Sequence, residues 1–351
     1  MKVIVIGAGI GGLCLANGLH NAGFDVSIHE ATQSPRPQGY RLHLNDDGIN
    51  ALTTTLPPET WKTFEATARV PKPRFVHLDT QLNPLDVMEH PGRHLSVDRT
   101  ELRQTLLSPV KPLITYGKRL TTFHTHPYGV TAHFTDGTTA SGDILIGADG
   151  INSAVRHQHL PHARITDTGL VQLYGKLPLS TDDKFSNIFT AITGPEHRVV
   201  GLGATRDYLT CSFSTRTTDL GADLHHMPQN ALRSAVMDRV STWHPQVRDM
   251  IARWQEIFPV PLRTCVPVAP WPTSRVTLLG DAIHAMSPAG GVGANTALRD
   301  AATLTAALTT GASPLAAIHA YEKSMTDYAF TAVHTSAALG TRFLGQNPLP
   351  T

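Results

Sequence analysis

Residues 2–30 read KVIVIGAGIGGLCLANGLHNAGFDVSIHE and combine three features. A short run of Val and Ile, Lys2–Ile6, is typical of a strand that is buried on both faces. The glycine-rich stretch Gly7–Gly12 follows at once and fits the pattern GxGxxG, and a helix is expected over Leu13–Ala22. Asp25–His29 then predicts a second strand. Together these segments predict a βαβ unit of the kind that binds a dinucleotide.

Each part of this unit has a physical reason for its residue types. Gly7 allows the tight turn, Gly9 lets a pyrophosphate approach the backbone, and Gly12 permits close packing of helix on strand. The N-terminus of the helix supplies unpaired N–H groups and a partial positive charge for the phosphates. Glu30 lies 18 residues after Gly12, where a carboxylate can accept both hydroxyls of a ribose. The unit does not distinguish FAD from NAD.

Two further strand ends carry a similar pattern. Ile144–Ile146 runs into Gly147–Arg156 (GADGINSAVR), in which Asp149 lies at the turn before a predicted helix. A second buried strand precedes Gly280–Asn295 (GDAIHAMSPAGGVGAN), with Asp281 at the strand end where open α/β sheets bind ligands. Each aspartate taken alone is equally explained as a helix cap.

Length and composition bound the rest of the chain. The 351 residues correspond to two domains, and a hydrophobic content of 41% is typical of a globular chain. Lys plus Arg number 29 against 28 for Asp plus Glu, so the net charge is only +1. The sequence therefore lacks the excess of basic residues that is typical of proteins that bind nucleic acid or a membrane surface. Three dispersed cysteines favour a reducing compartment. Without a signal peptide or a long apolar stretch, the sequence predicts a cytoplasmic protein.

Outside the motifs, the pattern suggests an inserted module. Short strands and turns are expected over Lys118–Ile146, and a helix with Asp98 as its N-cap precedes them. Residues 166–265 mix strand-like pieces with one amphipathic helix, Asn230–Trp243. After them a buried strand leads into helices that continue to about Arg342. We therefore expect a nucleotide domain assembled from non-adjacent segments around a middle module.

The order GxGxxG…Glu, then DG, then GD…P…G resembles the FAD-dependent aromatic hydroxylases, the class A flavoprotein monooxygenases with the para-hydroxybenzoate hydroxylase fold and TetX-like relatives. Ser96–Arg103 (SVDRTELR) resembles the R-x-x-L-R helix of this family, Gly39–Leu44 (GYRLHL) its strand beside the flavin, and Tyr321–Ser336 its C-terminal helix. The resemblance covers most of residues 1–165 and 266–340, and the middle hundred residues match loosely.

The resemblance implies an α/β fold. It consists of a Rossmann-like FAD-binding domain of the glutathione-reductase type, with an inserted α+β substrate domain built on a mixed β-sheet. The FAD-binding domain is expected over 1–75, 95–165 and 266–351, and the substrate domain over 76–94 and 166–265. Because the chain ends at Thr351, we expect no extra C-terminal domain of the kind that some phenol hydroxylases carry.

The resemblance also implies a reaction cycle. NAD(P)H reduces FAD, the reduced flavin forms a C4a-hydroperoxyflavin with O2, and this species hydroxylates or epoxidises an aromatic or polyketide-like small molecule. The protein binds, orients and excludes water while the cofactor carries the chemistry. A reductase or oxidase on the same fold, or a non-catalytic flavoprotein, is the alternative. A flavin halogenase is disfavoured, because its W-x-W-x-I-P signature is missing. A monomer or homodimer is expected.

Cofactor roles follow from the same resemblance. The glycine loop holds the pyrophosphate, Glu30 the adenosine ribose, and Arg103 the flavin side. Asp281 serves the ribityl chain, and Asp149 organises the DG turn. The expected cofactor-binding residues are Gly7, Gly9, Gly11, Gly12, Glu30, Arg41, Arg103, Asp149, Asp281, Pro288, Gly293 and Ala294. The chain departs from many relatives at Ala31, Val292 and Ala294, where they have Arg, Gln and Gly; the loop can still present its backbone amides to the flavin.

Catalytic and substrate-binding residues are less constrained. Arg41 and His43 alternate on one face of their strand, so both are candidates to face the cavity, with solvent as the alternative. Tyr174 and Phe213 lie on expected strands and are candidates for the pocket wall, with a core position as the alternative. His284 faces either FAD or solvent.

The 19 histidines raise the question of a metal site. Closely spaced histidines occur without a partnering acid or cysteine framework, so they are interpreted as surface residues and no metal is predicted. They are His124 and His126, His157, His159 and His162, and His225 and His226.

Overall fold

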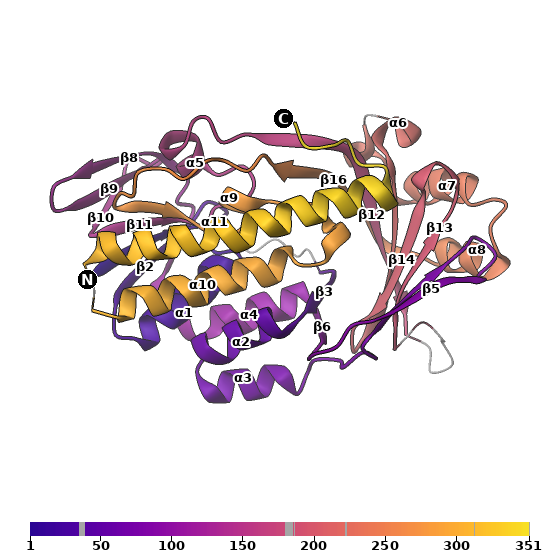
Figure 1. The fold of residues 1–351 in the computed structure, drawn as a ribbon, viewed down its shortest axis with the longest axis horizontal. Coiled ribbons are helices and arrows are strands. Elements are labelled where there is room, and N and C mark those ends of the chain that lie inside the picture. The colour runs from indigo at the N-terminus through magenta and orange to yellow at the C-terminus, as the bar shows by residue number, and fades with distance from the viewer. Residues whose placement is uncertain (35–38, 180–184, 186, 222, 312, 351) are drawn as a thin grey trace.

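The structure is a computed structural model that describes residues 1–34, 39–179, 185, 187–221, 223–311 and 313–350, and it is organised around two large sheets. A parallel sheet and the long helices form one side of the molecule, and a seven-stranded mixed sheet forms the other (Figure 1). Within the described residues, no helix combines the length and the apolar character needed to cross a bilayer.

The parallel sheet draws its strands from distant parts of the chain. Its order is β17 (Val276–Leu278), β11 (Ile144–Gly147), β1 (Lys2–Ile6), β2 (Asp25–Glu30) and β7 (Ile114–Tyr116). Val3–Ile6 are buried, as the apolar run predicted, because β1 lies in the middle of the sheet with a parallel neighbour on each side. The pairing of β1 with β11 brings the DG motif beside the N-terminal βαβ unit.

Helices and a small antiparallel sheet pack against the parallel sheet in one continuous core. The helices are α1 (Ile10–Asn21), α2 (Asp46–Thr55), α3 (Pro58–Glu65), α4 (Arg99–Val110), α10 (Gly293–Thr309) and α11 (Pro314–Leu339). The small sheet is β8 (Leu120–His126), β9 (Gly129–Phe134) and β10 (Thr139–Gly142), as the expected turns predicted. Two short helices, α5 (Ala154–His159) and α9 (Asp281–His284), also lie on this side, whereas the short helix α6 (Thr217–Leu220) packs against β12 and β15 of the seven-stranded sheet.

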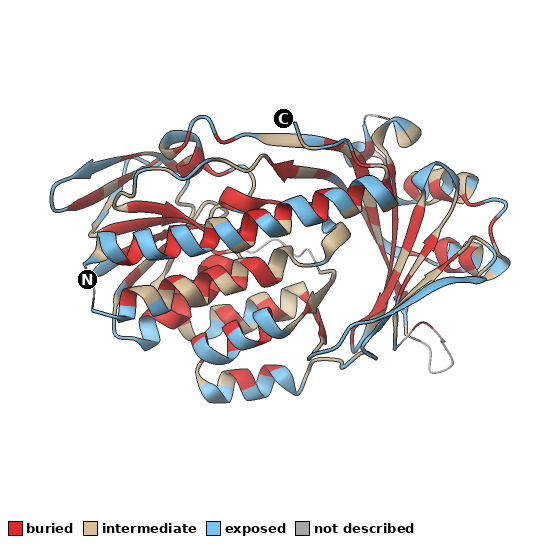
Figure 2. Cartoon of the chain, viewed as in Figure 1, coloured by how far each residue is buried: buried red, intermediate tan, exposed pale blue. Residues whose placement is uncertain are grey.

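The seven-stranded sheet carries a core of its own. Its order is β16 (Gln255–Cys265), β12 (Ile165–Pro178), β15 (Tyr208–Arg216), β14 (Val199–Ala204), β13 (Phe189–Thr193), β4 (Arg74–Leu78) and β5 (Pro84–Glu89). Neighbouring strands are antiparallel except β13 and β4, so the sheet is mixed, as expected. Helices α7 (Gln229–Arg239) and α8 (Pro245–Ala252) lie on its outer side and bury Trp243 and Trp254 with it (Figure 1). Figure 2 shows this buried core and the exposed edge strand β5.

A two-stranded ladder lies between the two sheets. β3 (Arg41–Leu44) pairs antiparallel with β6 (Leu95–Asp98), whose four residues are all buried. Ser96 of this ladder accepts a hydrogen bond from Nε of Arg41 at 2.7 Å and donates one to the carbonyl oxygen of Ala204 in β14. Ser96 of β6 therefore connects β3, the strand that resembles the family's strand beside the flavin, to β14 of the seven-stranded sheet.

One predicted helix is wrong in its extent. The helix expected over Asn230–Trp243 ends at Arg239, and the sequence reasoning missed a second helix that begins at Pro245. Proline at the first helical position has no N–H to satisfy, and its ring prevents a helix from running through it. His244 caps the new helix, with Nδ1 accepting from the N–H of Gln246 at 3.2 Å.

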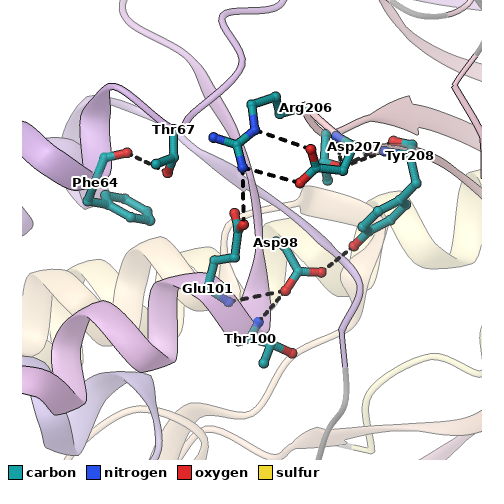
Figure 3. Close-up of polar contacts among 9 residues, drawn as sticks. Phe64, Thr67, Asp98, Thr100, Glu101, Arg206, Asp207 and Tyr208 are labelled. Carbon is teal, nitrogen blue, oxygen red and sulfur yellow. Dashed lines mark hydrogen bonds and ion pairs between the residues drawn. The ribbon is translucent and has the colours of Figure 1, made fainter.

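The start of α4 ties the two sides of the molecule together (Figure 3). Asp98 caps the helix, as predicted, by accepting from the N–H groups of Thr100 at 2.7 Å and Glu101 at 3.2 Å. Its other oxygen accepts from the hydroxyl of Tyr208 in β15 at 2.5 Å. The carboxylate of Glu101 forms an ion pair with Arg206 at 3.6 Å instead of closing a capping box. The contact between Tyr208 and Asp98 therefore anchors the seven-stranded sheet to α4.

We expect Tyr208→Phe to lower the free energy of unfolding by about 1.5–3 kcal/mol, because a hydrogen bond to a charged group is lost while the ring packing is kept. Urea titration followed by fluorescence measures the change. Tyr128→Phe is the matched control, since Tyr128 is 86% exposed and its loss of a hydroxyl should change the same quantity by less than about 0.5 kcal/mol. Equal effects of the two substitutions would contradict the assigned anchor.

Candidate functional site

In the glycine-rich loop, two glycines pack tightly against backbone atoms, Gly11 packs against the side chain of Leu279, and Gly9 is open. Gly7 has φ +105°, and a Cβ there would lie 2.4 Å from the carbonyl oxygen of Ala148. A Cβ at Gly12 would lie 2.4 Å from the carbonyl oxygen of Gly7. A Cβ at Gly9 would meet no atom within 4 Å. The space above Gly9 is therefore free for a ligand that needs contact with the backbone, as a pyrophosphate does.

Glu30 and Arg103 bind the backbone N–H and the carbonyl oxygen of Ala8 in this loop. The carboxylate of Glu30 accepts from the N–H of Ala8 at 2.8 Å and from the N–H and hydroxyl of Thr32 at 2.9 and 2.8 Å. Nε of Arg103 donates to the carbonyl oxygen of Ala8 at 3.0 Å. Burial alone raises the pKa of Glu30, but the hydrogen bonds from Thr32 and Ala8 outweigh it, so the net pKa is lowered. Glu30 is therefore ionised at neutral pH.

Asp149 organises the DG turn. One of its oxygens accepts from the N–H groups of Ala154 at 2.7 Å and Val155 at 3.3 Å, at the start of α5. Burial raises the pKa of this carboxyl above its ordinary value. Its neighbours Ala148 and Gly150 line the cavity described below, and Asp149 does not. This position supports the expected role as a structural residue of the turn.

A cavity of about 410 Å³ lies where the two sides of the molecule meet. Of the expected cofactor residues, the wall contains Gly9, Gly11, Gly12, Arg41, Asp281, Pro288, Gly293 and Ala294. Gly7, Glu30, Arg103 and Asp149 are outside it. The seven-stranded sheet contributes Gln172, Tyr174, Phe189, Gly201, Gly203, Thr210 and Ser212. One cavity thus combines a phosphate-type loop with a wall from the middle of the chain.

The GD turn is held from behind by Asp300 of α10. The carboxylate of Asp300 accepts from the N–H of Gly280 at 2.8 Å, from Nε2 of His284 at 2.5 Å and from the hydroxyl of Tyr328 at 2.6 Å. Burial alone lowers the pKa of His284, but the charge and hydrogen bond of Asp300 outweigh it, and the net pKa is raised. His284 is completely buried and lies outside the cavity wall, so it faces neither of its two expected environments. This buried pair fixes the turn that presents Asp281 to the cavity.

Asn295 is a structural residue that the sequence reasoning missed. Its Nδ2 donates to the carbonyl oxygen of His43 at 2.9 Å, and its Oδ1 accepts from the N–H of Asn45 at 2.9 Å. The side chain therefore joins the first turn of α10 to the end of β3. In the sequence, an amide among the small residues at the start of this helix was the available signal. The structure shows that Asn295 is buried, and buried polar side chains are usually hydrogen-bonded.

Arg41 packs against the part of the cavity wall that comes from the seven-stranded sheet. Its guanidinium lies over the ring of Phe189, 5.1 Å from the centroid, and its stem packs against Gly203, where a Cβ would lie 2.8 Å away. Burial lowers the pKa of Arg41 to about 10, so it remains a cation at neutral pH. Among the described residues no carboxylate forms an ion pair with it. Its charge is therefore available to a ligand.

Tyr174 belongs to a polar and aromatic wall. Its hydroxyl donates to Oε1 of Gln172 at 3.0 Å, and Nε2 of Gln172 donates to Ser212 at 3.1 Å. Its ring lies between Tyr40 and Phe258, at centroid distances of 5.1 and 5.4 Å. Sequence reasoning missed Gln172, although its spacing of two from Tyr174 on the same strand places both on one face.

Two other sets of candidates lie away from the cavity. Phe213 is fully buried in the core of the seven-stranded sheet, which is the alternative stated for it. His159 is half-buried, whereas the other closely spaced histidines are exposed. No group of three or more His, Cys, Asp or Glu side chains in the described part of the chain is arranged to hold a metal ion.

A second hollow, of about 670 Å³, lies between α1, α2 and α10. It is wide open to solvent and lined mainly by small and hydroxyl side chains. Its two charged residues, Asp47 and Arg299, already pair at 3.4 Å. None of the residues of the three glycine-containing motifs line this hollow. The cavity beside Gly9 is therefore the better candidate for the ligand site.

Comparisons with known proteins agree with this site. A family model described as FAD binding domain matches residues 1–336. The chain is 31% identical over 343 residues to an FAD-dependent urate hydroxylase of Klebsiella pneumoniae, covering 93% of this chain and 86% of that protein. It is 32% identical over 375 residues to the dual O-methyltransferase/FAD-dependent monooxygenase elcB of Phaeosphaeria nodorum, which covers 87% of this chain. The chain spans 40% of the length of elcB.

The fold is also similar to a solved structure, that of Klebsiella pneumoniae HpxO complexed with FAD and uric acid. The TM-score is 0.88 at 27% sequence identity, and the match covers 98% of this chain and 89% of that chain. The similarity therefore includes the seven-stranded sheet, where the sequence resemblance was loosest.

We expect Gly9→Ala to abolish FAD retention without loss of stability, because the added methyl enters open space where the pyrophosphate would lie. Flavin absorbance of the purified protein and the thermal midpoint of the FAD-free form are the measurements. Gly12→Ala is the contrasting variant, since its methyl meets the backbone 2.4 Å away and should lower stability even without FAD. Normal flavin loading of Gly9→Ala would contradict the assignment.

We expect Asp300→Asn to weaken FAD affinity at least tenfold and to lower the free energy of unfolding by about 3–5 kcal/mol, because it breaks a buried pair and loosens the GD turn. Fluorescence titration of FAD and urea unfolding measure the two effects. Tyr328→Phe removes one hydrogen bond from the same carboxylate and is the milder variant. Asp327→Asn, on the exposed side of α11, is the control. Wild-type FAD affinity in Asp300→Asn would refute the link between Asp300 and the cofactor site.

Proposed function

This chain belongs to the FAD binding domain family, and from that premise we propose that it is a monooxygenase that uses NAD(P)H and O2 to hydroxylate or epoxidise an aromatic or polyketide-like small molecule. Its cofactor is FAD. The proposal depends on one observation above all: the glycine loop and GD turn share a single cavity with a polar and aromatic wall from the seven-stranded sheet. A cofactor bound at the first would face a substrate bound at the second.

The residues of the nucleotide side fit FAD. When bound, FAD supplies redox chemistry, by taking electrons from NAD(P)H and passing one atom of O2 to the substrate. The open backbone at Gly9 and the free N–H groups at the start of α1 would hold its pyrophosphate. Asp281 would bind the ribityl region, and the loop from Pro288 to Ala294 would border the ring. Glu30 and Arg103 would shape the loop, with Glu30 also accepting from the ribose.

The substrate side favours a planar ring with a weakly acidic group. Arg41 offers an unpaired positive charge, while Gln172, Tyr174 and Ser212 offer hydrogen bonds without charge. Phe189 and Tyr40 offer flat apolar surfaces in the same wall. Uric acid, the ligand named for HpxO, has this combination of a flat ring and acidic N–H groups. We propose that the substrate of this chain is a hydroxylated aromatic or polyketide-like compound of the same chemical character.

Three further features remain proposals. The first is the division into two domains, an FAD-binding domain over 1–75, 95–165 and 266–351 and a substrate domain over 76–94 and 166–265. The two separate hydrophobic cores support this division. Strand β4 begins at Arg74 and therefore crosses the proposed boundary after residue 75. A monomer or homodimer and a cytoplasmic location are proposed from the sequence alone.

The decisive experiment uses purified protein loaded with FAD. NAD(P)H oxidation is measured with a panel of hydroxylated aromatics and polyketide-like compounds, and the products are analysed by mass spectrometry under labelled O2. We expect at least one compound to stimulate NAD(P)H oxidation and to gain one labelled oxygen atom. Stimulated oxidation that yields only peroxide would favour the oxidase alternative. Protein that cannot be loaded with FAD would overturn the proposal.

We expect Arg41→Gln to raise KM by about 10- to 100-fold with an unchanged FAD content, because a charge-assisted contact worth about 1.5–3 kcal/mol is removed from the substrate wall. Steady-state kinetics and the ratio of flavin to protein absorbance measure the two quantities. Arg253→Gln is the control, since Arg253 is an exposed residue paired with Asp249. Loss of FAD from Arg41→Gln would instead place Arg41 at the cofactor.

A further inference from the structure

His43 is one end of a pair of histidines that leads out of the cavity. It lines the cavity from β3, and its Nε2 lies 2.8 Å from Nδ1 of His94, just before β6. The two rings are stacked, with centroids 5.0 Å apart. Nε2 of His94 lies 2.8 Å from the carbonyl oxygen of His90. His94 is half-buried and His90 is exposed, so the contacts run from the cavity to the surface.

These contacts determine where the protons lie. A carbonyl oxygen can only accept, so Nε2 of His94 carries a hydrogen and donates it to His90. In a neutral His94 ring, Nδ1 is therefore an acceptor, and Nε2 of His43 must be the donor between the two rings. A neutral His43 then has a free lone pair on Nδ1. We find no hydrogen bond to that atom from any residue that the structure describes.

Burial and the surrounding positive charges keep His43 neutral. Burial, followed by the positive charge of Arg41 and the neighbouring His94 and His90, lowers the pKa of His43 to about 3. The carboxylate of Asp46 in α2 interacts electrostatically with His94 and is bound by Nε of Arg93 at 3.0 Å. His43 therefore keeps its acceptor on Nδ1 throughout the neutral pH range.

We propose that His43 and His94 form a proton path from the cavity to solvent, in which Nδ1 of His43 accepts the proton of an acidic O–H or N–H group of the substrate. The inference rests on the proposed function for the kind of ligand that occupies the cavity. His43 is the catalytic residue of the pair, since it contacts the substrate, and His94 acts through it.

The transfer balances in protons and charge. The O–H or N–H bond of the ligand breaks and a bond forms from its proton to Nδ1 of His43. The proton on Nε2 of His43 passes to Nδ1 of His94, and the proton on Nε2 of His94 leaves to water. The ligand becomes an anion beside the guanidinium of Arg41, two residues away on the same face of β3. To restore the starting tautomers, water gives a proton to Nε2 of His94, the proton on Nδ1 of His94 returns to Nε2 of His43, and the proton on Nδ1 of His43 passes to the product anion or to water in the emptied cavity.

The tautomers can be tested directly by NMR on FAD-loaded protein labelled with ¹⁵N-histidine. His43→Asn and His94→Asn identify the two sets of ring signals by their disappearance. At pH 8 we expect the His43 ring in the neutral Nε2–H form, and the His43 ring should not titrate between pH 8 and pH 5. A His43 ring that carries its proton on Nδ1, or that titrates near its ordinary pKa of about 6.5, overturns the proposal.

Transfer through His94 can be tested with 4-nitrophenol as the probe. Proton release on mixing it with FAD-loaded protein is followed by stopped flow with a pH dye in weak buffer. Asn at position 94 retains an acceptor for Nε2 of His43 but cannot relay a proton. We expect His94→Asn to slow proton release at least tenfold with affinity within twofold, and added imidazole to restore the rate. The exposed His126→Asn is the matched control. A wild-type rate in His94→Asn, or slow release that imidazole does not restore, overturns the role of His94.

These outcomes are separate from the proposed function. Neither measurement requires turnover, so a protein that binds FAD and 4-nitrophenol but never transfers oxygen would refute the monooxygenase and leave the proton path standing. Conversely, an oxygen-transferring enzyme with the wrong His43 tautomer would refute the path alone.

Discussion

The close packing of two strand-end turns determines the geometry of the nucleotide side. Gly7 leaves no room for a side chain against Ala148, so the turns after β1 and β11 are in contact. Backbone hydrogen bonds continue this contact along the sheet edge, from the N–H of Ala148 to Ile6 at 2.8 Å and from the N–H of Leu279 to Gly147 at 3.0 Å. Three motifs that are far apart in the chain therefore meet at one edge, where parallel strands present their carboxyl ends.

The polar groups around this edge fall into two layers. Glu30, Arg103, Asp149 and Asp300 bind backbone groups of the turns and take no part in the cavity wall. The wall itself presents mostly backbone, hydroxyl, amide and aromatic groups, and its charged residues are Arg41, Arg99 and Asp281. Charged side chains outside the cavity wall thus fix the shape of the loops, and their hydrogen bonds are stronger because they lie in a buried environment of low dielectric constant. The surface that a ligand meets is mostly uncharged.

The motif-bearing elements could be predicted from sequence because their signals are local. A strand, a GxGxxG loop and a helix follow one another within residues 2–22, and Asp98 caps its helix as its spacing to Glu101 suggested. The roles of His284 and Gln172 could not be read in this way. Each depends on a partner from another element, Asp300 and Ser212, and no periodicity along the chain records such a contact. Ser212 lies in the loosely matching middle of the chain, and Asp300 lies in α10.

The interleaved order of the strands has a consequence for synthesis on the ribosome. β1, β2 and β7 emerge early, but their neighbours β11 and β17 come from residues 144–147 and 276–278. Asp300, which holds the GD turn, is made later still. Domains usually fold as units while the chain grows, and long-range parallel pairing is intrinsically slow. The nascent chain must therefore carry an apolar, incomplete sheet until β17 has been made, and the nucleotide site can close only after β17 and Asp300 have left the exit tunnel.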